Sequence, residues 1–325
     1  MPVDQAITSR RFGIELEVIL PRCPSKLPKG GDATERVVKF LRSQGIQAMT
    51  EADMAADPRA ACGPVWKVAM DDSLGLEMDD FEGVEVISPI LSGEDAIKAV
   101  RQMASTLSKQ GFSTNFQTGM HVHHDVCDFD MPAWKRLMAN FMIAEPAFDQ
   151  LVSRFRRGDD NEHARTTRRG LGIEPLVQAF TKGLKVHGIA NKLFPGIKDD
   201  ERQVKLNVNS FAKHGTAEFR QHEGTLDPDR LEHWVRLTQG FVNHSKNSPE
   251  LLTVSRGVTD PIAAWSEVSQ AEADIKQPLL KRLLDVVPMK TRDYFSAVAA
   301  QTAAEKPLPA WLQPRPRHAI PTPVG

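Results

Sequence analysis

Short segments in which apolar and charged residues alternate constrain the fold of this chain more than any other feature. In residues 11–20 every second position is apolar, and Glu15 and Glu17 lie between the apolar positions. A repeat of two residues is typical of a strand that buries one face. The sequence therefore predicts a strand that carries Glu15 and Glu17 on one face, about 6–7 Å apart.

Four further predicted strands, residues 83–89, 116–126, 205–210 and 216–222, repeat the pattern with similar polar side chains. Carboxylate, imidazole and amide groups dominate their polar positions, which contain no lysine. These positions hold Glu85, His121, His123, Asn207, Asn209, Thr216, Glu218, Arg220 and His222. The solvated face of a half-exposed antiparallel sheet would also alternate in this way.

Metal binding is the interpretation that we favour for this shared face. Clustered carboxylates repel each other unless cations compensate them. Oxygen ligands with one or two imidazoles suit Mg²⁺ or Mn²⁺ better than structural zinc, which prefers thiolates or several histidines. Other interpretations stay open at single positions. One is that His121 and His123 are packed or solvent-facing histidines that bind no metal. Another is that Glu218 and Arg220 form a simple ion pair. Otherwise Glu218 is a metal ligand beside a guanidinium that binds phosphate.

Helices are predicted between these strands. Apolar spacing favours helices over residues 33–44, 92–109, 132–154, 228–244 and 268–286, with Ser92 and Asp227 as N-caps. Residues 65–70 are predicted as a short strand, 53–64 as a loop, and 213–215 as the turn of a hairpin joining the last two strands. Strands mixed with helices, without regular alternation, indicate an α+β fold with a mainly antiparallel sheet.

Composition narrows the class of protein. The chain has 325 residues, 41% of them hydrophobic and 26% charged, which suits two domains or one large domain with an extension. With 41 basic and 42 acidic residues, its overall charge favours neither nucleic acid nor an anionic membrane as a partner. Three widely spaced cysteines, no apolar leader and no long apolar run predict a protein of the reducing cytoplasm.

Two segments are unusual in composition. Residues 153–169 contain six arginines and three acidic residues. They are either a solvated helix end or loop, or a mobile anion-binding lid over the polar face. Residues 307–325 are rich in proline and are predicted to be flexible.

The order of several motifs resembles a known family. They are Phe12-Gly-Ile-Glu-Leu-Glu17, the segment Trp66 to Ser73, Gly83-Val-Glu-Val-Ile-Ser-Pro89, Gly119-Met-His-Val-His123, Ser153-Arg154 and the segment Gly215 to Thr225. Together they resemble the amidoligase family, carboxylate–amine ligases related to glutamine synthetase and glutamate–cysteine ligase. The resemblance covers about residues 10–245, and it departs from the family at residues 156–158, where a cysteine or an aromatic residue is frequent.

The resemblance implies both a fold and a reaction. The fold is a glutamine-synthetase-like curved, mainly antiparallel sheet, with a metal-binding concave face and helices on the other side. Enzymes of this superfamily bind ATP with two or more Mg²⁺ or Mn²⁺ ions and phosphorylate a carboxylate. An amine then displaces phosphate and an amide forms. The expected substrates are an acid and an amine, as small molecules, peptides or a protein terminus, and the oligomeric state is left open.

The resemblance also implies roles for individual residues. The expected metal ligands are Glu15, Glu17, Glu85, His123 and Glu218. The residues expected to bind ATP are His121, Arg220, Asn207, Asn209 and His222. Arg220, Arg154 and Asp71 are the candidates for catalysis. The expected division of the chain is a catalytic domain over residues 1–245, a helical extension over 246–306, and the tail.

Two other functions compete with this interpretation. His121-Val-His-His-Asp125 resembles part of the metal motif of metallo-β-lactamase-like hydrolases, but Val126 replaces its last histidine. A zinc hydrolase would bind zinc tightly and no nucleotide. A non-catalytic protein that retains the ligase fold should have lost a carboxylate, whereas Glu15, Glu17, Glu85 and Glu218 are all present.

Overall fold

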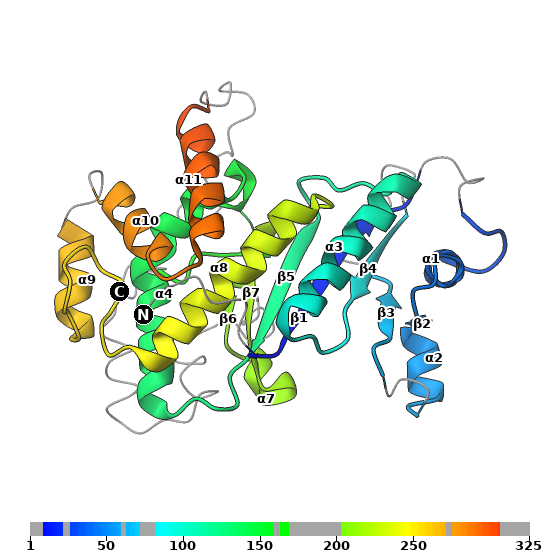
Figure 1. Ribbon diagram of the computed structural model, residues 1–325, viewed down its shortest axis with the longest axis horizontal. Coiled ribbons are helices and arrows are strands. Elements are labelled where there is room, and N and C mark those ends of the chain that lie inside the picture. Colours follow the sequence, from blue (N-terminus) through cyan, green and yellow to red (C-terminus); the bar gives the residue numbers. More distant parts are fainter. Residues whose placement is uncertain are drawn as a thin grey trace, which may run out of the picture.

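A seven-stranded sheet runs through the protein in the order β2-β3-β4-β1-β5-β7-β6 (Figure 1). The computed structural model describes residues 9–21, 27–59, 63–71, 82–158, 161, 163–168, 203–270 and 275–305. The strands are β1 (Phe12–Ile19), β2 (Ala48–Thr50), β3 (Trp66–Ala69), β4 (Gly83–Ile87), β5 (Gly119–Asp125), β6 (Leu206–Asn207) and β7 (Thr216–Glu223). β2 and β3 pair in parallel, and the other neighbouring strands pair antiparallel.

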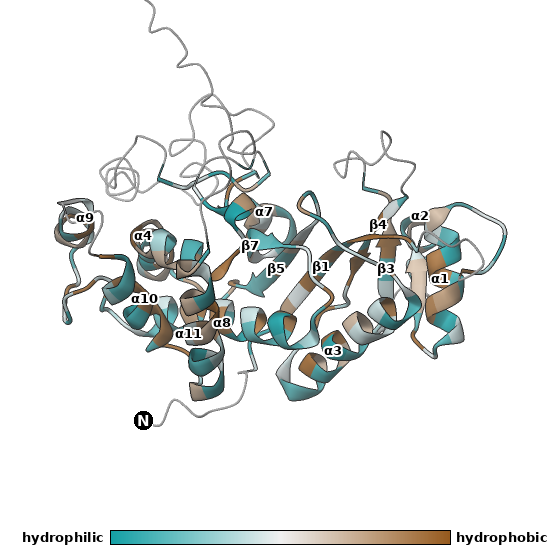
Figure 2. Ribbon diagram, turned by 90° about the horizontal axis from the view of Figure 1, so that it is seen from above, coloured by the Kyte–Doolittle hydropathy of each residue, from teal (hydrophilic) through white to brown (hydrophobic). Residues whose placement is uncertain are grey.

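Helices cover one face of this sheet. Viewed from above, α3 (Gly93–Gln110) and α8 (Pro228–Asn247) lie on one side, and the short α7 (Ser210–His214) lies on the other (Figure 2). The other helices are α1 (Ala33–Ser43), α2 (Glu51–Ala56), α4 (Met131–Phe148), α9 (Pro261–Gln270), α10 (Lys276–Leu284) and α11 (Met289–Ala303). A mixed sheet with helices confirms the predicted α+β class, while the curvature of the sheet stays a prediction.

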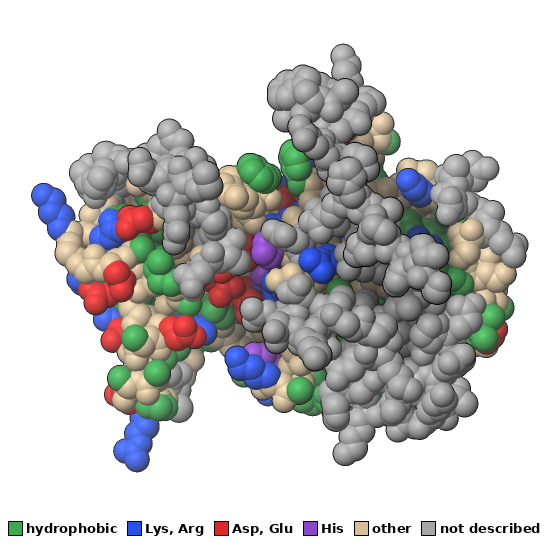
Figure 3. Space-filling view, turned by 180° about the vertical axis from the view of Figure 1, so that it is seen from behind, with side chains coloured by type: hydrophobic (Ala, Val, Ile, Leu, Met, Phe, Trp, Pro, Cys, Tyr) green, Lys and Arg blue, Asp and Glu red, His purple; other side chains and the backbone are tan. Residues whose placement is uncertain are grey.

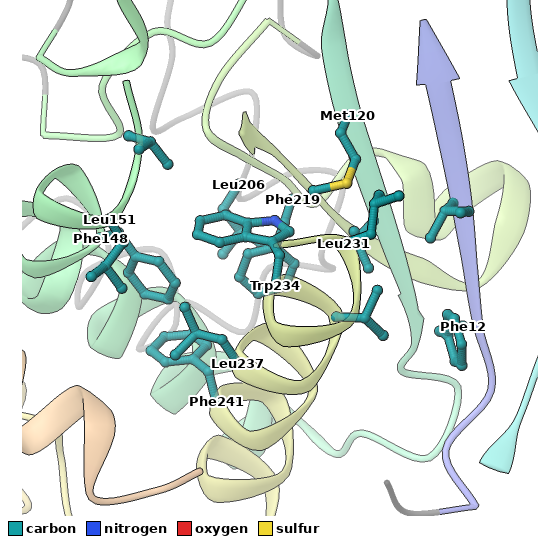
Figure 4. Packing of buried hydrophobic residues seen from close by; sticks show 14 of the residues in the cluster. Phe12, Met120, Phe148, Leu151, Leu206, Phe219, Leu231, Trp234, Leu237 and Phe241 are labelled. Carbon is teal, nitrogen blue, oxygen red and sulfur yellow. The ribbon is translucent and has the colours of Figure 1, made fainter. Parts of the chain in front are cut away.

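The core lies between the sheet and these helices. The apolar positions of β1, including Ile14 and Val18, have no exposed surface. Trp234 and Phe241 of α8 pack against Phe148 of α4 and Phe219 of β7 (Figure 4). Aromatic side chains bury large apolar areas, so this cluster fixes α8 firmly on the sheet. The charged positions of the same strands are therefore left on the opposite face.

Most predicted elements are confirmed, with ends shifted by a few residues. The strands predicted at 11–20, 65–70, 83–89 and 116–126 correspond to β1, β3, β4 and β5. The helices predicted at 33–44, 92–109 and 228–244 correspond to α1, α3 and α8. Asp227 caps α8 through its side chain, whereas Ser92 occupies the N-cap of α3 without a side-chain hydrogen bond.

Several predictions were wrong in detail. The predicted loop at 53–64 begins with part of α2, because the hydroxyl of Thr50 accepts a hydrogen bond from the Asp53 N–H and starts a helical turn. The predicted helix 132–154 ends at Phe148 and continues as two 3₁₀ turns, η4 (Asp149–Leu151) and η5 (Arg154–Arg156). Helix α7 replaces the tight turn expected between β6 and β7. The helix expected at 268–286 is divided between α9 and α10. The tail at 307–325 lies outside the described residues.

Candidate functional site

The register of the sheet brings the predicted ligands together. Glu17 of β1 lies opposite Glu85 of β4, and Glu15 lies opposite His121 of β5. His123 lies opposite Glu218 of β7. Side chains directly opposite each other across antiparallel strands have Cβ atoms about 4.5–5.5 Å apart. Four strands therefore contribute to a single continuous polar patch.

His121 lies at the centre of this patch. Its Nδ1 is 3.1 Å from Glu15 Oε2 and 3.7 Å from Glu218 Oε1. Its Nε2 is 3.6 Å from Glu17 Oε1. The two ring nitrogens thus face different carboxylates, and the imidazole separates Glu15 and Glu218 on one side from Glu17 on the other.

His123 extends the patch toward Thr216, the first residue of β7. Its Nε2 is 3.2 Å from Glu15 Oε1, and its Nδ1 is 3.0 Å from the hydroxyl of Thr216. Burial opposes protonation of His123, but the hydrogen bond and charge of Glu15 and the charge of Glu218 together raise its pKa. The two histidines therefore bind Glu15 from two directions.

Glu218 is held by an amide and a guanidinium. Asn207 Nδ2 donates to its Oε2 at 2.7 Å, and Arg220 Nη1 forms an ion pair with its Oε1. Burial would raise the pKa of Glu218, but the charges of Arg220, His123 and His121 lower it. The ion pair that the sequence left as an alternative is thus present, and it holds the guanidinium beside the ligand cluster.

The carboxylates differ in how easily they carry a charge. Burial, followed by the charges of Glu15, Asp71 and Glu17, raises the pKa of Glu85 to about 9. Glu15 shows the opposite behaviour: burial opposes its charge, but hydrogen bonds from His121 and His123 hold its pKa well below the usual range. One carboxyl is therefore protonated at neutral pH unless a cation compensates the cluster.

A cavity of about 760 Å³ lies over this patch. Glu15, Glu17, Glu85 and Glu218 lie in its wall, together with both histidines. Acidic and histidine side chains gather near the middle of the corresponding face of the molecule (Figure 3). One part of the rim is apolar, with Met70 and Ile90, and another carries Lys213 and His214 of α7. The cavity is large enough for a small-molecule substrate.

The donor set fits divalent cations. Two groups of ligand atoms, each within 4.8 Å of one another, could each hold an ion: Glu15, His121 and Glu218, and Glu17, Glu85 and His121. Mainly carboxylate donors with one imidazole suit Mg²⁺ or Mn²⁺. The raised pKa of Glu85 is consistent with this assignment, because a bound cation would offset both the burial and the neighbouring carboxylates that raise it.

The structure brings most of the predicted site residues to the cavity. Asp71, Asn207, Asn209 and Arg220 line it with the glutamates and histidines. Arg154 is not among the lining residues, and its Nη2 instead lies 3.5 Å from Glu305 Oε2 after the end of α11. The 3₁₀ turn η5 therefore directs Arg154 toward the C-terminal helix and not into the cavity, where its expected catalytic role would require it.

His222 also lies away from the cavity. The pairing of β5 with β7 shifts between Met120 and Val122, so that His222 lies opposite the buried Met120. Its ring lies 4.7 Å from that of Trp234, on the side covered by α8. The bulge turns His222 to the core face, where simple alternation from Glu218 would have placed it on the polar face.

The structure adds contacts and residues that the sequence did not reveal. Thr216, which was expected on the polar face, bonds His123, and His214, which was not expected in the site, lies with its ring 6.0 Å from that of His123. His163 and Gln203 line the cavity from a bridge that joins Arg165 to Val204. This bridge anchors part of the arginine-rich segment beside β6, whereas Arg169 lies outside the described residues. Strand alternation placed Thr216 on the polar face, but it did not predict the contact with His123.

Sequence and structure comparisons place the chain in a family. A family model described as "Putative amidoligase enzyme" matches residues 8–242. Among curated proteins, none matches the chain. A solved structure described as the crystal structure of a novel glutamine synthase homolog is similar at 13% identity and a TM-score of 0.36, covering 90% of this chain and 67% of that one. Because the family model spans more than half of its length, this chain belongs to the family of putative amidoligase enzymes, which indicates a ligase-type enzyme.

Proposed function

We propose that this chain is an ATP-dependent carboxylate–amine ligase that forms an amide bond through an acyl phosphate. The observation that carries this proposal is the convergence of Glu15, Glu17, Glu85 and Glu218 on one cavity, beside two imidazoles and Arg220. A face so rich in buried carboxylates serves no purpose in packing, because it costs stability through repulsion. It is suited to holding cations and the phosphates that accompany them.

The proposed reaction has two steps. A carboxylate oxygen of the acid attacks the γ-phosphorus of ATP, and ADP leaves. The amine nitrogen then attacks the acyl carbon, inorganic phosphate leaves, and the nitrogen loses a proton. The substrates are thus an acid and an amine, each a small molecule, a peptide or a protein terminus.

Arg220 is positioned to bind the transferred phosphoryl group. Glu218 holds one end of its guanidinium, and its buried Nε has no hydrogen-bond partner among the described residues. A fixed guanidinium with a free donor stabilises charge that develops on phosphate oxygens. Asn207 and Asn209 supply further polar groups at the cavity wall, and Asp71 is the candidate base for the amine.

Two or more divalent cations complete this proposal. The ligand group of Glu15, His121 and Glu218 would hold one ion, and that of Glu17, Glu85 and His121 another, with His123 beside the first. When bound, such cations neutralise the phosphate oxygens of ATP. Because a neutral imidazole has one lone pair available for a metal, His121 would ligate one of these ions, and the carboxylates of the other group would hold the other ion.

Titration calorimetry of a non-hydrolysable ATP analogue, in Mg²⁺ and then in EDTA, tests this function. We expect binding that requires Mg²⁺, and we expect Glu218→Gln to weaken it by about 100-fold or more, since even changes behind a metal ligand cost 10- to 100-fold. Glu35→Gln, an exposed glutamate on α1 outside the cavity, is the matched control and should bind normally.

The opposite results identify the alternatives. Normal binding by a folded Glu218→Gln variant would exclude the assigned site. Co-purified zinc without nucleotide binding would favour the hydrolase. A wild-type protein that binds neither metal nor nucleotide would favour a non-catalytic member of the family.

A further inference from the structure

A second arginine, Arg156, is buried beside the carboxylate cluster. Arg156 is only 1% exposed, although it belongs to the 3₁₀ turn η5 in the arginine-rich segment. Its neighbours Arg154 and Arg157 point toward Glu305. A three-residue turn thus separates one inward-facing arginine from two that face the C-terminal helix.

Arg156 binds the turn that leads into β5. Its Nη2 donates to the carbonyl oxygens of Gln117 and Thr118, at 3.0 Å for Gln117. The next residue, Gly119, donates its N–H to Glu17 Oε2 at 2.5 Å. A single guanidinium therefore binds two successive peptide groups, and the second of these, which joins Thr118 to Gly119, also donates the N–H that Glu17 accepts.

The space around Gly119 shows how closely these groups approach. A Cβ atom on Gly119 would lie 3.0 Å from His121 Nε2, 3.4 Å from Arg156 Nη2 and 3.4 Å from Glu17 Oε1. A Cβ atom at this position would therefore require the neighbouring side chains to shift by a few tenths of an ångström. Arg156 is thus packed against the second ligand group without lining the cavity itself.

The energetic cost of Arg156 needs an explanation. Burying a charged guanidinium is costly, as it is for other ions, unless charged partners compensate the charge. No ion pair joins Arg156 to a carboxylate among the described residues, and its Nε has no hydrogen-bond partner there. The nearest compensation is the charge of Glu17 and Glu223, which acts against burial on the pKa of Arg156. A side chain so costly is expected to serve the site.

We propose that Arg156 is a positioning residue, which holds the Gln117–Gly119 turn and thereby fixes the carboxylate of Glu17 for the ion bound by Glu17, Glu85 and His121. This inference rests on the proposed function, because it needs an ion at that ligand group.

Titration of Mn²⁺ alone into the full-length protein tests this role. We expect Arg156→Gln to lower the affinity for one Mn²⁺ ion by about 10-fold, the effect typical of losing a group that orients a metal ligand. The affinity for the other ion should not change. Arg156→Lys, which keeps a charged donor, should restore part of the affinity. Arg157→Gln is the matched control, since Arg157 binds the Val152 carbonyl and Glu305 instead of the turn, and it should leave both ions unchanged.

The direction of the change in Mn²⁺ affinity distinguishes a positioning role of Arg156 from a purely electrostatic one. Removal of a nearby positive charge alone would strengthen cation binding, so tighter Mn²⁺ binding by Arg156→Gln would overturn the proposal, as would unchanged binding. A wild type that binds no Mn²⁺ would overturn the proposed function together with this inference. Binding by the wild type with unaltered binding by the variant would overturn this inference alone.

A double-mutant cycle covers the case in which Arg156→Gln fails to fold. Glu17→Gln should remove the second ion and leave the one held by Glu15, His121 and Glu218. We then expect Arg156→Lys to lower the affinity for the second ion in the wild-type background. In the Glu17→Gln background, where that ion is already lost, Arg156→Lys should not change Mn²⁺ binding further. A loss of affinity at the remaining ion in the double variant would instead show a general structural role.

Discussion

Glu85 is the residue on which repulsion within the site acts most strongly. Burial, Glu15, Asp71 and Glu17 together raise its pKa to about 9, from an ordinary value of 4.5. Between these two values the folded protein keeps a proton on Glu85 that the unfolded chain has released. Linkage then requires the free energy of unfolding to fall as the pH rises through this interval. A cation that binds Glu85 must displace the same proton.

The first prediction concerns Glu85→Gln in EDTA. Between pH 5 and 9, Glu85 should lower the free energy of unfolding of the wild type by up to about 1.4 kcal/mol for each unit of rising pH. The variant should lack this contribution to the slope of the free energy of unfolding against pH. Urea unfolding at pH 6, 7 and 8 measures the difference. Equal slopes for the two proteins would contradict the assignment, and Glu35→Gln, which changes an exposed carboxylate, should keep the wild-type slope.

The second prediction follows from the same proton. Because Mg²⁺ needs the ionised carboxylate, the affinity for Mg²⁺ should rise with pH below 9, by up to 10-fold per unit while Glu85 alone limits binding. Calorimetry in buffers with different ionisation enthalpies should show that a proton is released on binding. Affinity that does not change between pH 6.5 and 8.5 would contradict the displacement of a proton from Glu85 by the bound ion.

At the residue scale, the sequence identified the acidic part of the site but only some of its basic part. Strand alternation places Glu15, Glu17 and Glu218 on one face whatever the order of the strands. The arginines could not be sorted in this way. Arg154 and Arg156 lie in a segment with many similar residues, and the choice between them depends on a 3₁₀ turn that leaves no periodic pattern.

At the scale of elements, β7 shows how a local irregularity redirects a prediction. One shift of register against β5 is enough to move His222 from the expected polar face to the core. The residues at the bulge carry no glycine or proline that would reveal it in the sequence. Glu218 and Arg220 precede the shift along the strand, and so their predicted side of the sheet was correct.

The start of β7 depends on Gly215, which gives the third prediction. Gly215 has a φ of +69°, and a Cβ there would lie 2.5 Å from Cys127 Sγ. The left-handed conformation costs a non-glycine residue about 1–2 kcal/mol. Gly215→Ala should therefore lower the free energy of unfolding by more than about 2 kcal/mol, because the steric contact adds to this strain.

Two comparisons separate the contributions in Gly215→Ala. Gly257 has a similar φ of +78° with open space around it, so Gly257→Ala measures the conformational cost alone. In a Cys127→Ala background, the cost of Gly215→Ala should fall to the level seen at Gly257. Equal costs at both glycines in the wild-type background would mean that the thiol contact is unimportant.

At the scale of the whole molecule, the order of the strands was beyond prediction. β1 lies between β4 and β5, and β7 lies between β5 and β6, so neighbours in the sheet are often far apart along the chain. Pairing of this kind depends on the complementarity of whole strands, which a single sequence does not reveal. The shared polar face nevertheless predicted that these strands belong to one sheet. No helix within the described ranges is long and apolar enough to cross a membrane.

The last prediction concerns the layer between the sheet and α8, where two histidines are buried without charge. Burial lowers the pKa of His124 to about 3 and that of His222 to about 4. His124 Nε2 lies 2.8 Å from the Thr238 hydroxyl, and His222 Nε2 accepts a hydrogen bond from Arg230 Nε at 3.3 Å. A proton on His222 Nε2 would remove that acceptor.

The sign of the pH dependence follows from these depressed pKa values. Below an ordinary pKa of 6.5 the unfolded chain takes up protons that the folded protein refuses. The free energy of unfolding should therefore fall as the pH drops from 6.5 toward 4, by up to about 1.4 kcal/mol per unit for each histidine. In His222→Gln, which keeps a neutral polar group, the slope of the free energy of unfolding against pH should be smaller over this interval by the contribution of one histidine. Urea unfolding in EDTA from pH 7 to pH 4.5 gives both slopes. A variant as sensitive to acid as the wild type would show that the pKa of His222 is the same in the folded and the unfolded protein, which contradicts its burial against Trp234.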